Sequence, residues 1–318
     1  MHSFLDLADH SGEEIAALLA LAKRLEQHPE PQALAGKILG LLFFNPSLRT
    51  MSSFQAGMAR LGGSSFVISA GNGTWQLETR RGAIMDGVAA EHVREGVPVL
   101  SHYCDVLGIR AFAGGTNLNE DLAETSFREM TSLVAKPVIN MESAVNHPCQ
   151  ALADWKTMDD LGLPQRAKFV LSWVNHPRAL PLAVPSATVH MAAMRGMDVV
   201  VLRPEGFALP DAIMAKARAA ADSAGGTLRE TSNRAEALAG AQVVYAKEWG
   251  CTSHYGNADV DRELRSKLTD WCVRDSWFEH TLADCRLMHC LPVRRNVAVA
   301  DEVLDSARSV VQREAYNR

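Results

Sequence analysis

The chain has 318 residues, of which 47% are hydrophobic and 22% are charged. This composition is typical of a folded globular protein and excludes a disordered chain, a collagen and a disulfide-rich miniprotein. The formal net charge of −5 provides no general attraction to nucleic acid or to an acidic membrane. At roughly 100–200 residues per domain, the length predicts two domains.

The six cysteines are scattered, and none forms a C-x-x-C pair or a zinc-ligand spacing. In a chain of this size, such cysteines indicate free thiols in a reducing compartment. The first ten residues contain acids and no long apolar run, so they predict neither a signal peptide nor an anchor. The longest apolar stretches fall far below the ~20 residues of a membrane helix. We therefore expect a cytoplasmic protein.

Hydrophobic periodicity predicts alternating helices and strands in the first half of the chain. Ser11 and Glu14 form a capping-box pattern at the start of the first helix. The predicted helices cover residues 11–26, 50–61, 90–100 and 119–134. The predicted strands cover residues 38–44, 65–68, 106–112 and 137–140, with a polar loop at 71–82.

The second half repeats this rhythm. Its predicted helices cover 151–161, 187–195 and 211–224, and a last helix starts at 301–306. Its predicted strands cover 168–173, 198–202, 243–246 and 287–290, with a proline-bearing loop at 176–185. Repeated strand–helix units predict an α/β fold of two domains, 1–145 and 146–318, each a parallel sheet flanked by helices. Since such sheets bind ligands at the carboxyl ends of their strands, we expect the active site in the interdomain cleft.

The first candidate segment is Ser47-Leu48-Arg49-Thr50, which follows a predicted strand and opens a predicted helix. A helix N-terminus offers backbone N–H groups and a positive dipole end, both of which suit phosphate. The two hydroxyl groups and the guanidinium add further donors. A plain N-cap with a surface arginine explains the tetrapeptide equally well.

Two more polar segments follow predicted strands. His147 and Gln150 can both donate to a carbonyl oxygen, although a capping loop with a surface histidine is the commoner reading. The second segment is His289-Cys290-Leu291-Pro292, followed by Arg294. Cys290 could be a nucleophile, but adjacent strand residues point to opposite faces, so His289 is badly placed to activate it. A buried structural thiol is therefore the better interpretation.

These three segments, in this order and spacing, resemble the three signature motifs of the aspartate/ornithine carbamoyltransferase family. They are residues 44–50 (F-N-P-S-L-R-T), 147–154 (H-P-C-Q-A-L-A-D) and 289–292 (H-C-L-P). The resemblance, together with the α/β rhythm, covers essentially the whole chain. It implies transfer of a carbamoyl group from carbamoyl phosphate to an amine, without a metal ion or organic cofactor.

By this resemblance, one set of residues binds carbamoyl phosphate. The phosphate would be held by Ser47, the backbone of Leu48, Arg49 and Thr50. Arg110 would bridge the phosphate and the carbonyl oxygen, His147 and Gln150 would orient the carbamoyl group, and Arg318 would be a further ligand. Donors aimed at the developing oxyanion and the leaving phosphate supply electrostatic stabilisation.

The chain departs from the family pattern at two points. Met51 and Gln55 stand where the family usually has Arg and Glu. Side chains four apart on a helix meet, so the two changes together remove a salt bridge without leaving an unpaired charge. Family members usually continue past the last arginine with a helix that returns to the first domain, whereas Arg318 is the last residue here.

The remaining motifs resemble the branch of the family that acts on ornithine whose α-amine is acylated. No S-M-G segment of the ornithine enzymes occurs in this sequence. By resemblance, Glu142 would face the acyl amide, while Lys247 and Arg294 would bind the substrate carboxylate. The carbonyl of Leu291, next to Cys290, would position the attacking amine. Trp75 would reach into a neighbouring subunit's site, although a loop-anchoring aromatic is the simpler interpretation.

Three differences favour an N-succinyl over an N-acetyl substrate. Ala90 stands where the acetyl enzymes place Glu, so no acid opposes a second carboxylate. The loop at 176–185 resembles the proline-rich loop of the succinyl enzymes, with His176 and Arg178 as candidate partners for that carboxylate. Ala298 stands where the acetyl enzymes carry a lysine. N-acetylornithine stays as the alternative substrate.

The resemblance also implies a homotrimer with sites at subunit interfaces, and a role in arginine biosynthesis. Two rivals from other classes are a catalytically silent paralogue that binds carbamoyl phosphate and a cysteine hydrolase that uses Cys290. The first predicts damaged phosphate ligands, and the second predicts a covalent intermediate. A nucleotide-binding protein is disfavoured, because neither G-x-G-x-x-G nor G-x-x-x-x-G-K-[ST] occurs.

Overall fold

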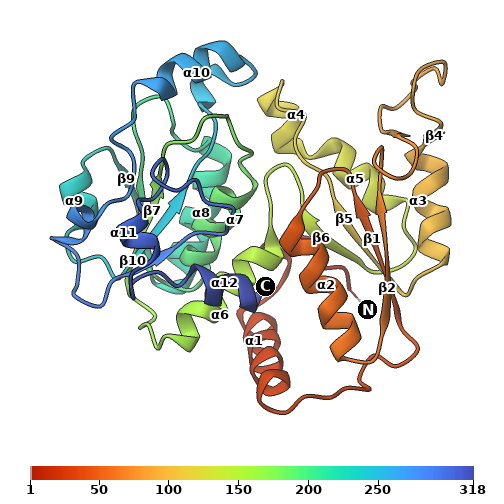
Figure 1. Ribbon diagram of the computed structural model, residues 1–318, viewed down its shortest axis with the longest axis horizontal. Helices are drawn as coiled ribbons and strands as arrows, with labels where there is room; N and C mark the ends of the chain where they lie inside the picture. The colour runs from red at the N-terminus through yellow and green to blue at the C-terminus, as the bar shows by residue number, and fades with distance from the viewer. Residues whose placement is uncertain (1) are drawn as a thin grey trace. The chain divides into compact units, whose positions relative to one another are not determined.

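A computed structural model describes residues 2–318 and contains two compact units. Unit 1 runs to Gly114 and also includes Asn119–Cys149. Unit 2 consists of Gly115–Leu118 and Gln150–Arg318. Each unit has a parallel sheet with flanking helices, so the predicted two-domain α/β fold is confirmed (Figure 1).

The sheet of unit 1 has the strand order β2-β1-β5-β6, and all neighbours are parallel. Its strands are β1 (Ile38–Phe43), β2 (Ser64–Ser69), β5 (Val106–Arg110) and β6 (Val138–Glu142). The short strands β3 (Leu77–Glu78) and β4 (Glu91–His92) form a separate pair. The helices are α1 (Gly12–Gln27), α2 (Leu48–Arg60), α3 (Val93–His102), α4 (Leu118–Ala123) and α5 (Thr125–Ser132).

Alternate residues of β1 face two different apolar clusters, which explains why its sequence is apolar throughout. Leu42 packs in a cluster with β5, α3 and α5, whereas Leu41 and Phe43 pack in a cluster that includes Phe54 of α2. Met51 of α2 is half-buried against this second cluster. The substitution of Met for a charged residue therefore adds apolar packing on the helix that carries the candidate phosphate site.

The sheet of unit 2 has the order β11-β10-β7-β8-β9 and is also parallel. Its strands are β7 (Lys168–Trp173), β8 (Asp198–Leu202), β9 (Thr227–Thr231), β10 (Val243–Lys247) and β11 (Arg286–Met288). Its longer helices are α6 (Pro148–Asp160), α7 (Ala183–Met194), α8 (Asp211–Ala224) and α10 (Ala258–Ser266). Its shorter helices are α9 (Arg234–Leu238), α11 (Asp301–Leu304) and α12 (Val311–Asn317).

Several predicted elements have the predicted bounds, and the capping box at Ser11 is present. The predicted helix at 119–134 is wrong, because Glu124 adopts φ 51° and divides it into α4 and α5. The predicted strand at 287–290 ends at Met288, so His289 and Cys290 lie beyond it. The loop at 71–82 contains β3, and the helix predicted to begin at residue 90 begins at Val93, after β4.

Of the helices in residues 2–318, none is both long and apolar enough to cross a lipid bilayer.

Candidate active site

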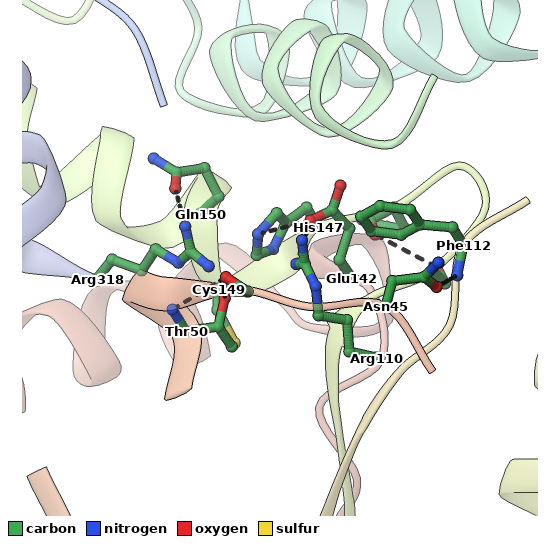
Figure 2. Close-up of polar contacts among 12 residues, drawn as sticks. Asn45, Thr50, Arg110, Phe112, Glu142, His147, Cys149, Gln150 and Arg318 are labelled. Atoms are coloured by element: carbon green, nitrogen blue, oxygen red, sulfur yellow. Dashed lines mark hydrogen bonds and ion pairs between the residues drawn. The ribbon is translucent and has the colours of Figure 1, made fainter. Parts of the chain in front are cut away.

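In unit 1, the ends of three neighbouring strands bring together most of the predicted carbamoyl-phosphate residues. Ser47 caps α2 just after β1, Arg110 is the last residue of β5, and Glu142 is the last residue of β6. His147 follows β6 (Figure 2). Because β1, β5 and β6 are adjacent and parallel, their carboxyl ends share one edge of the sheet, where α/β folds bind ligands.

The start of α2 has the geometry of an anion site. Ser47 Oγ accepts a hydrogen bond from the backbone N–H of Thr50 at 3.2 Å and donates to Thr50 Oγ1 at 2.9 Å. Thr50 is fully buried, and Arg49 is half-buried. The side chain of Leu48 is exposed, so its contribution to an anion site comes from its backbone N–H. The segment is an N-cap, and the same backbone geometry can hold a phosphate.

The side chains of Arg110 and His147 converge on one carboxylate oxygen (Figure 2). Arg110 Nη1 donates to Glu142 Oε2, and His147 Nε2 lies 3.4 Å from the same oxygen. All three residues are buried, and the Arg110 guanidinium lies 4.6 Å from the ring centroid of Phe112. Asn45 holds Phe112 by accepting its backbone N–H at 2.8 Å. A cation and an imidazole aimed at one oxygen anion can polarise a carbonyl group.

Glu142, which the resemblance assigns to the acyl amide of the second substrate, contacts Arg110 and His147, two residues predicted to bind carbamoyl phosphate. Glu142 lies beside Arg110 because β5 and β6 pair in parallel and the two residues are register partners. A register shift between Ile109 and Arg110 accompanies this pairing.

Two further predicted residues lie on the segment around β3 and β4. Trp75 is more than half exposed, and its indole Nε1 donates to Glu91 Oε2 at 2.9 Å. Ala90 is exposed. Sequence reasoning missed Glu91, which directly follows Ala90 and holds the indole.

In unit 2, Gln150 and Arg318 come together although they are 168 positions apart in the sequence. Arg318 Nη1 donates to Gln150 Oε1 at 3.2 Å (Figure 2). Gln150 is buried, and its Nε2 donates to Asp154 Oδ1 at 2.8 Å and to Glu314 Oε1 at 3.1 Å. Sequence reasoning assigned no role to the two acids. The signal that could have revealed them is their spacing, since each stands one helical turn from a predicted ligand.

The predicted N-acylornithine residues of unit 2 follow three neighbouring strands, β7, β10 and β11. Lys247 ends β10 and is buried, with Nζ 3.4 Å from Glu248 Oε1. Arg294 Nε donates to His176 Nε2 over 3.4 Å. Burial lowers the pKa of His176, so its ring is neutral at pH 7 and can accept this bond. His176 Nδ1 lies 2.9 Å from the backbone carbonyl oxygen of Arg178 and 3.0 Å from its backbone nitrogen, and the Arg178 side chain is exposed.

The segment after β11 is held by His289. Its Nδ1 accepts the backbone N–H of Leu291 at 2.9 Å, and its Nε2 lies 3.2 Å from Glu248 Oε2. Burial acts to raise the pKa of Glu248, but Lys247 and His289 outweigh it and hold that pKa well below its usual range. Leu291 adopts φ 54°, a strained conformation of the kind found at functional sites.

The same segment argues against a cysteine nucleophile. Burial raises the pKa of Cys290 to about 12, so its thiol is protonated at neutral pH. Both ring nitrogens of His289 are engaged elsewhere, with Leu291 and Glu248. Across residues 2–318, no cluster of three or more histidine, cysteine or acidic side chains is arranged to hold a metal ion.

Residues 2–160 match the carbamoyl-P binding domain of aspartate/ornithine carbamoyltransferase, and residues 183–318 match the Asp/Orn binding domain of the same family. The chain belongs to this family of enzymes. The N-acetylornithine carbamoyltransferase of Xanthomonas campestris pv. campestris is 35% identical over 99% of this chain and 94% of its own. The N-succinylornithine carbamoyltransferase of Bacteroides thetaiotaomicron is 37% identical over 89% of this chain and 84% of its own.

Solved structures of carbamoyltransferases have the same fold. A variant of N-acetyl-L-ornithine transcarbamylase with one glutamate replaced by proline, complexed with carbamyl phosphate and N-succinyl-L-norvaline, superimposes with a TM-score of 0.95. It is 35% identical, and the match covers 100% of this chain and 96% of that one. An acetylornithine transcarbamylase complexed with acetylcitrulline also superimposes with a TM-score of 0.95 at 36% identity, with the same coverage.

Proposed function

We propose that this carbamoyltransferase transfers the carbamoyl group of carbamoyl phosphate to the δ-amine of N-succinyl-L-ornithine, giving N-succinyl-L-citrulline and phosphate. The observation that carries the proposal is the convergence of Arg110 and His147 on one anionic oxygen beside the capped start of α2. Related enzymes that act on N-acylated ornithines match nearly the whole chain, which supports this substrate class.

In this proposal, the start of α2 binds the phosphate. The first-turn N–H groups, the Ser47 and Thr50 hydroxyl groups and the Arg49 guanidinium supply donors to its oxygens. Arg318 adds a second guanidinium. The same donors stabilise the phosphate as it leaves, because negative charge grows on its bridging oxygen.

Arg110, His147 and Thr50 polarise the carbamoyl carbonyl, and Gln150 orients the carbamoyl group. When the neutral δ-amine attacks, the new C–N bond forms as the carbonyl oxygen becomes an oxyanion. The C–O bond to phosphate then breaks, and the departing phosphate takes the extra proton of the amine. Each donor to the oxyanion is worth about 2.7–4 kcal/mol in reactions of this type.

The second substrate is held by residues that follow β7, β10 and β11. Lys247 and Arg294 bind its α-carboxylate, and the carbonyl of Leu291, next to Cys290, accepts a hydrogen bond from the δ-amine. Glu142 accepts the amide N–H of the acyl group. His176 and Arg178 bind the distal carboxylate of a succinyl group, for which the exposed guanidinium of Arg178 supplies the charge.

The residue that favours succinyl over acetyl is Ala90. A carboxylate at this position would repel the distal carboxylate of succinylornithine, and alanine removes that repulsion. Transcarbamylase variants with one glutamate replaced by proline, alanine, serine or valine have been crystallised with N-succinyl-L-norvaline, a ligand that carries a succinyl group. These complexes support the proposal that a site without this glutamate can accept a succinyl group.

N-acetyl-L-ornithine is the second candidate substrate. The observation in its favour is the similarity to N-acetylornithine carbamoyltransferases of Xanthomonas and Xylella. We further propose a homotrimer in which Trp75 reaches a neighbouring subunit's site, and a cytoplasmic enzyme of arginine biosynthesis. The six free cysteines fit a reducing compartment.

The test is to incubate the purified protein with carbamoyl phosphate and N-succinylornithine and to identify the product by mass spectrometry. We expect N-succinylcitrulline and an equal amount of phosphate. Phosphate release without a carbamoylated amine would indicate a hydrolase, and no reaction with any ornithine derivative would indicate the silent paralogue. Arg94→Ala, at an exposed ion pair of unit 1, is the matched control for variants of the site.

A further inference from the structure

A pair of buried acids lies beside Gln150 and Arg318 in unit 2. Asp154 follows Gln150 by one turn of α6, and Glu314 precedes Arg318 by one turn at the end of α12. Both acids are fully buried. We call Asp154 and Glu314 the acid pair.

The acid pair fixes the amide of Gln150. Gln150 Nε2 donates to both acids, at 2.8 Å and 3.1 Å, and Gln150 Oε1 accepts from Arg318 at 3.2 Å. A reversed amide would put its NH2 group against a guanidinium, which has no acceptor, so only this orientation satisfies all three contacts. The acid pair therefore determines which way Gln150 presents its oxygen to Arg318.

Glu314 also joins α12 to the sheet. Its Oε1 accepts from the Tyr245 hydroxyl at 3.2 Å, and its Oε2 accepts from the backbone N–H of His289 at 2.9 Å. Tyr245 lies on β10 and His289 follows β11. One carboxyl group thus ties α12, the helix that precedes Arg318, to β10 and to the segment that follows the neighbouring strand β11.

Two carboxyl groups in this setting cannot both be ionised. Asp154 Oδ1 and Glu314 Oε1 both accept from Gln150 Nε2, at 2.8 Å and 3.1 Å, so the two fully buried carboxyl groups are close neighbours, and one of two such groups keeps its proton. Burial raises the pKa of both acids, and repulsion between them raises that of Glu314 further. With one proton, the pair carries a single negative charge that balances Arg318. The other titratable groups facing the pair are Tyr245, His289 and Cys290.

We propose that Asp154 and Glu314 are positioning residues that hold one proton between them and orient Gln150 and Arg318 toward carbamoyl phosphate. The ligand rests on the proposed function, whereas the shared proton rests on the contacts within unit 2 alone. Loss of the proton at alkaline pH gives the pair a second negative charge, which more than balances Arg318. The affinity for the anionic carbamoyl phosphate therefore falls as the pH rises.

Infrared difference spectroscopy detects the proton on the acid pair directly. At neutral pH, the wild type should show the C=O stretch of a protonated buried carboxyl group. This band should disappear in Asp154→Asn and in Glu314→Gln, because each variant leaves a single carboxylate. Absence of the band from the wild type, or its persistence in both variants, would overturn the shared proton.

Kinetics separate a positioning role from a merely structural one. Asp154→Ala removes a contact of Gln150 and should raise the KM for carbamoyl phosphate roughly 10-fold or more. Asp154→Asn keeps the shape and the single charge, so it should rescue KM at pH 7 and abolish the rise of KM at alkaline pH. If Asp154→Ala does not fold, the comparison of Asp154→Asn with the wild type across pH decides the question.

Asp160→Asn is the matched control. Asp160 also joins α6 to α12, through Arg313 and Asn317, but it lies at the far end of α6 from Gln150. This variant should keep the wild-type KM and pH profile. An active wild type whose KM profile is unchanged by Asp154→Ala and Asp154→Asn would overturn the positioning role. An inactive wild type would contradict the proposed function instead, and the infrared result would still decide the shared proton.

Discussion

The carboxylate of Glu142 is hydrogen-bonded to the guanidinium of Arg110, and both side chains are buried. The same carboxylate oxygen lies 3.4 Å from His147 Nε2. In the proposed reaction, Arg110 and His147 contact carbamoyl phosphate, whereas Glu142 contacts the acyl amide. Glu142 therefore has to exchange one set of partners for another as the substrates bind.

Glu142→Gln should separate these two roles. Removing the charge frees Arg110 from a competing anion, so the dissociation constant of carbamoyl phosphate should fall by roughly 5-fold or more. The KM for the N-acylornithine should rise, because the amide is a weaker acceptor than the carboxylate. Isothermal titration measures the first effect and steady-state kinetics the second. Glu129→Gln, at an exposed ion pair of unit 1, serves as control, and weaker carbamoyl phosphate binding by Glu142→Gln would contradict the exchange.

Arg110→Ala and Arg49→Ala should each lower kcat/KM by two orders of magnitude or more. Each removes a donor to charge that develops in the transition state, worth about 2.7–4 kcal/mol. Steady-state product formation measures the loss. The exposed Arg94→Ala should leave kcat/KM unchanged. A near-normal rate for Arg49→Ala would contradict the assignment of the α2 start to phosphate.

Cys290→Ser should retain most of the activity. Because burial raises the thiol pKa to about 12, almost no thiolate is present at pH 8. The proposed role of this segment uses the backbone carbonyl of Leu291, which the substitution leaves in place. Denaturing mass spectrometry during turnover should find no carbamoyl adduct on the protein. Complete loss of activity together with a trapped adduct in the wild type would favour the cysteine hydrolase.

Ala90→Glu should shift the acyl preference. The new carboxylate repels the distal carboxylate of a succinyl group, so kcat/KM for N-succinylornithine should fall roughly 10-fold, while that for N-acetylornithine should change less. The side chain in Ala90→Gln is similar in size to that in Ala90→Glu but uncharged, so comparing the two variants separates the effect of charge from the effect of size. Equal losses for both substrates, or equal effects of Glu and Gln, would contradict a charge-based acyl preference.

Glu248 should make the protein sensitive to acid. Its pKa is lower in the folded than in the unfolded state, so its stabilising effect is present above the ordinary glutamate range and is lost as the pH falls through the folded value. Glu248→Gln should therefore lower the unfolding temperature at pH 7 and flatten its dependence on pH in the acid range. Thermal unfolding followed by circular dichroism from acid to neutral pH measures this. The exposed Glu279→Gln is the control, and the same acid dependence in the wild type and in Glu248→Gln would contradict the effect.

Local patterns predicted most of the fold. The strand at Lys168–Trp173 and the helix at Asp211–Ala224 have apolar patterns and end signals that depend on nearby residues alone, so the sequence predicts their bounds well. The break at Glu124 was missed because the periodicity continues across it and no glycine or proline marks it. Helix α12 was missed because it is short and depends on tertiary contacts, including those of the fully buried Glu314.

In the site, too, local motifs predict some features, whereas others depend on tertiary contacts. The types of its expected ligands and their positions after strands follow from motifs, and so does the choice of Gln150 and the distant Arg318 as two of these ligands. The pairing of Arg110 with Glu142 could not be predicted, because it depends on β5 and β6 being neighbours in register. The acid pair was missed for a related reason, since α12 was not predicted and Glu314 therefore had no place in the fold.

The central claim is tested most directly by kcat/KM for N-succinylornithine, N-acetylornithine and free ornithine, measured side by side at saturating carbamoyl phosphate. We predict that N-succinylornithine has the highest value, N-acetylornithine a lower one and free ornithine the lowest. A higher value for N-acetylornithine would contradict the succinyl assignment. A clear preference for free ornithine would contradict the N-acylornithine substrate itself.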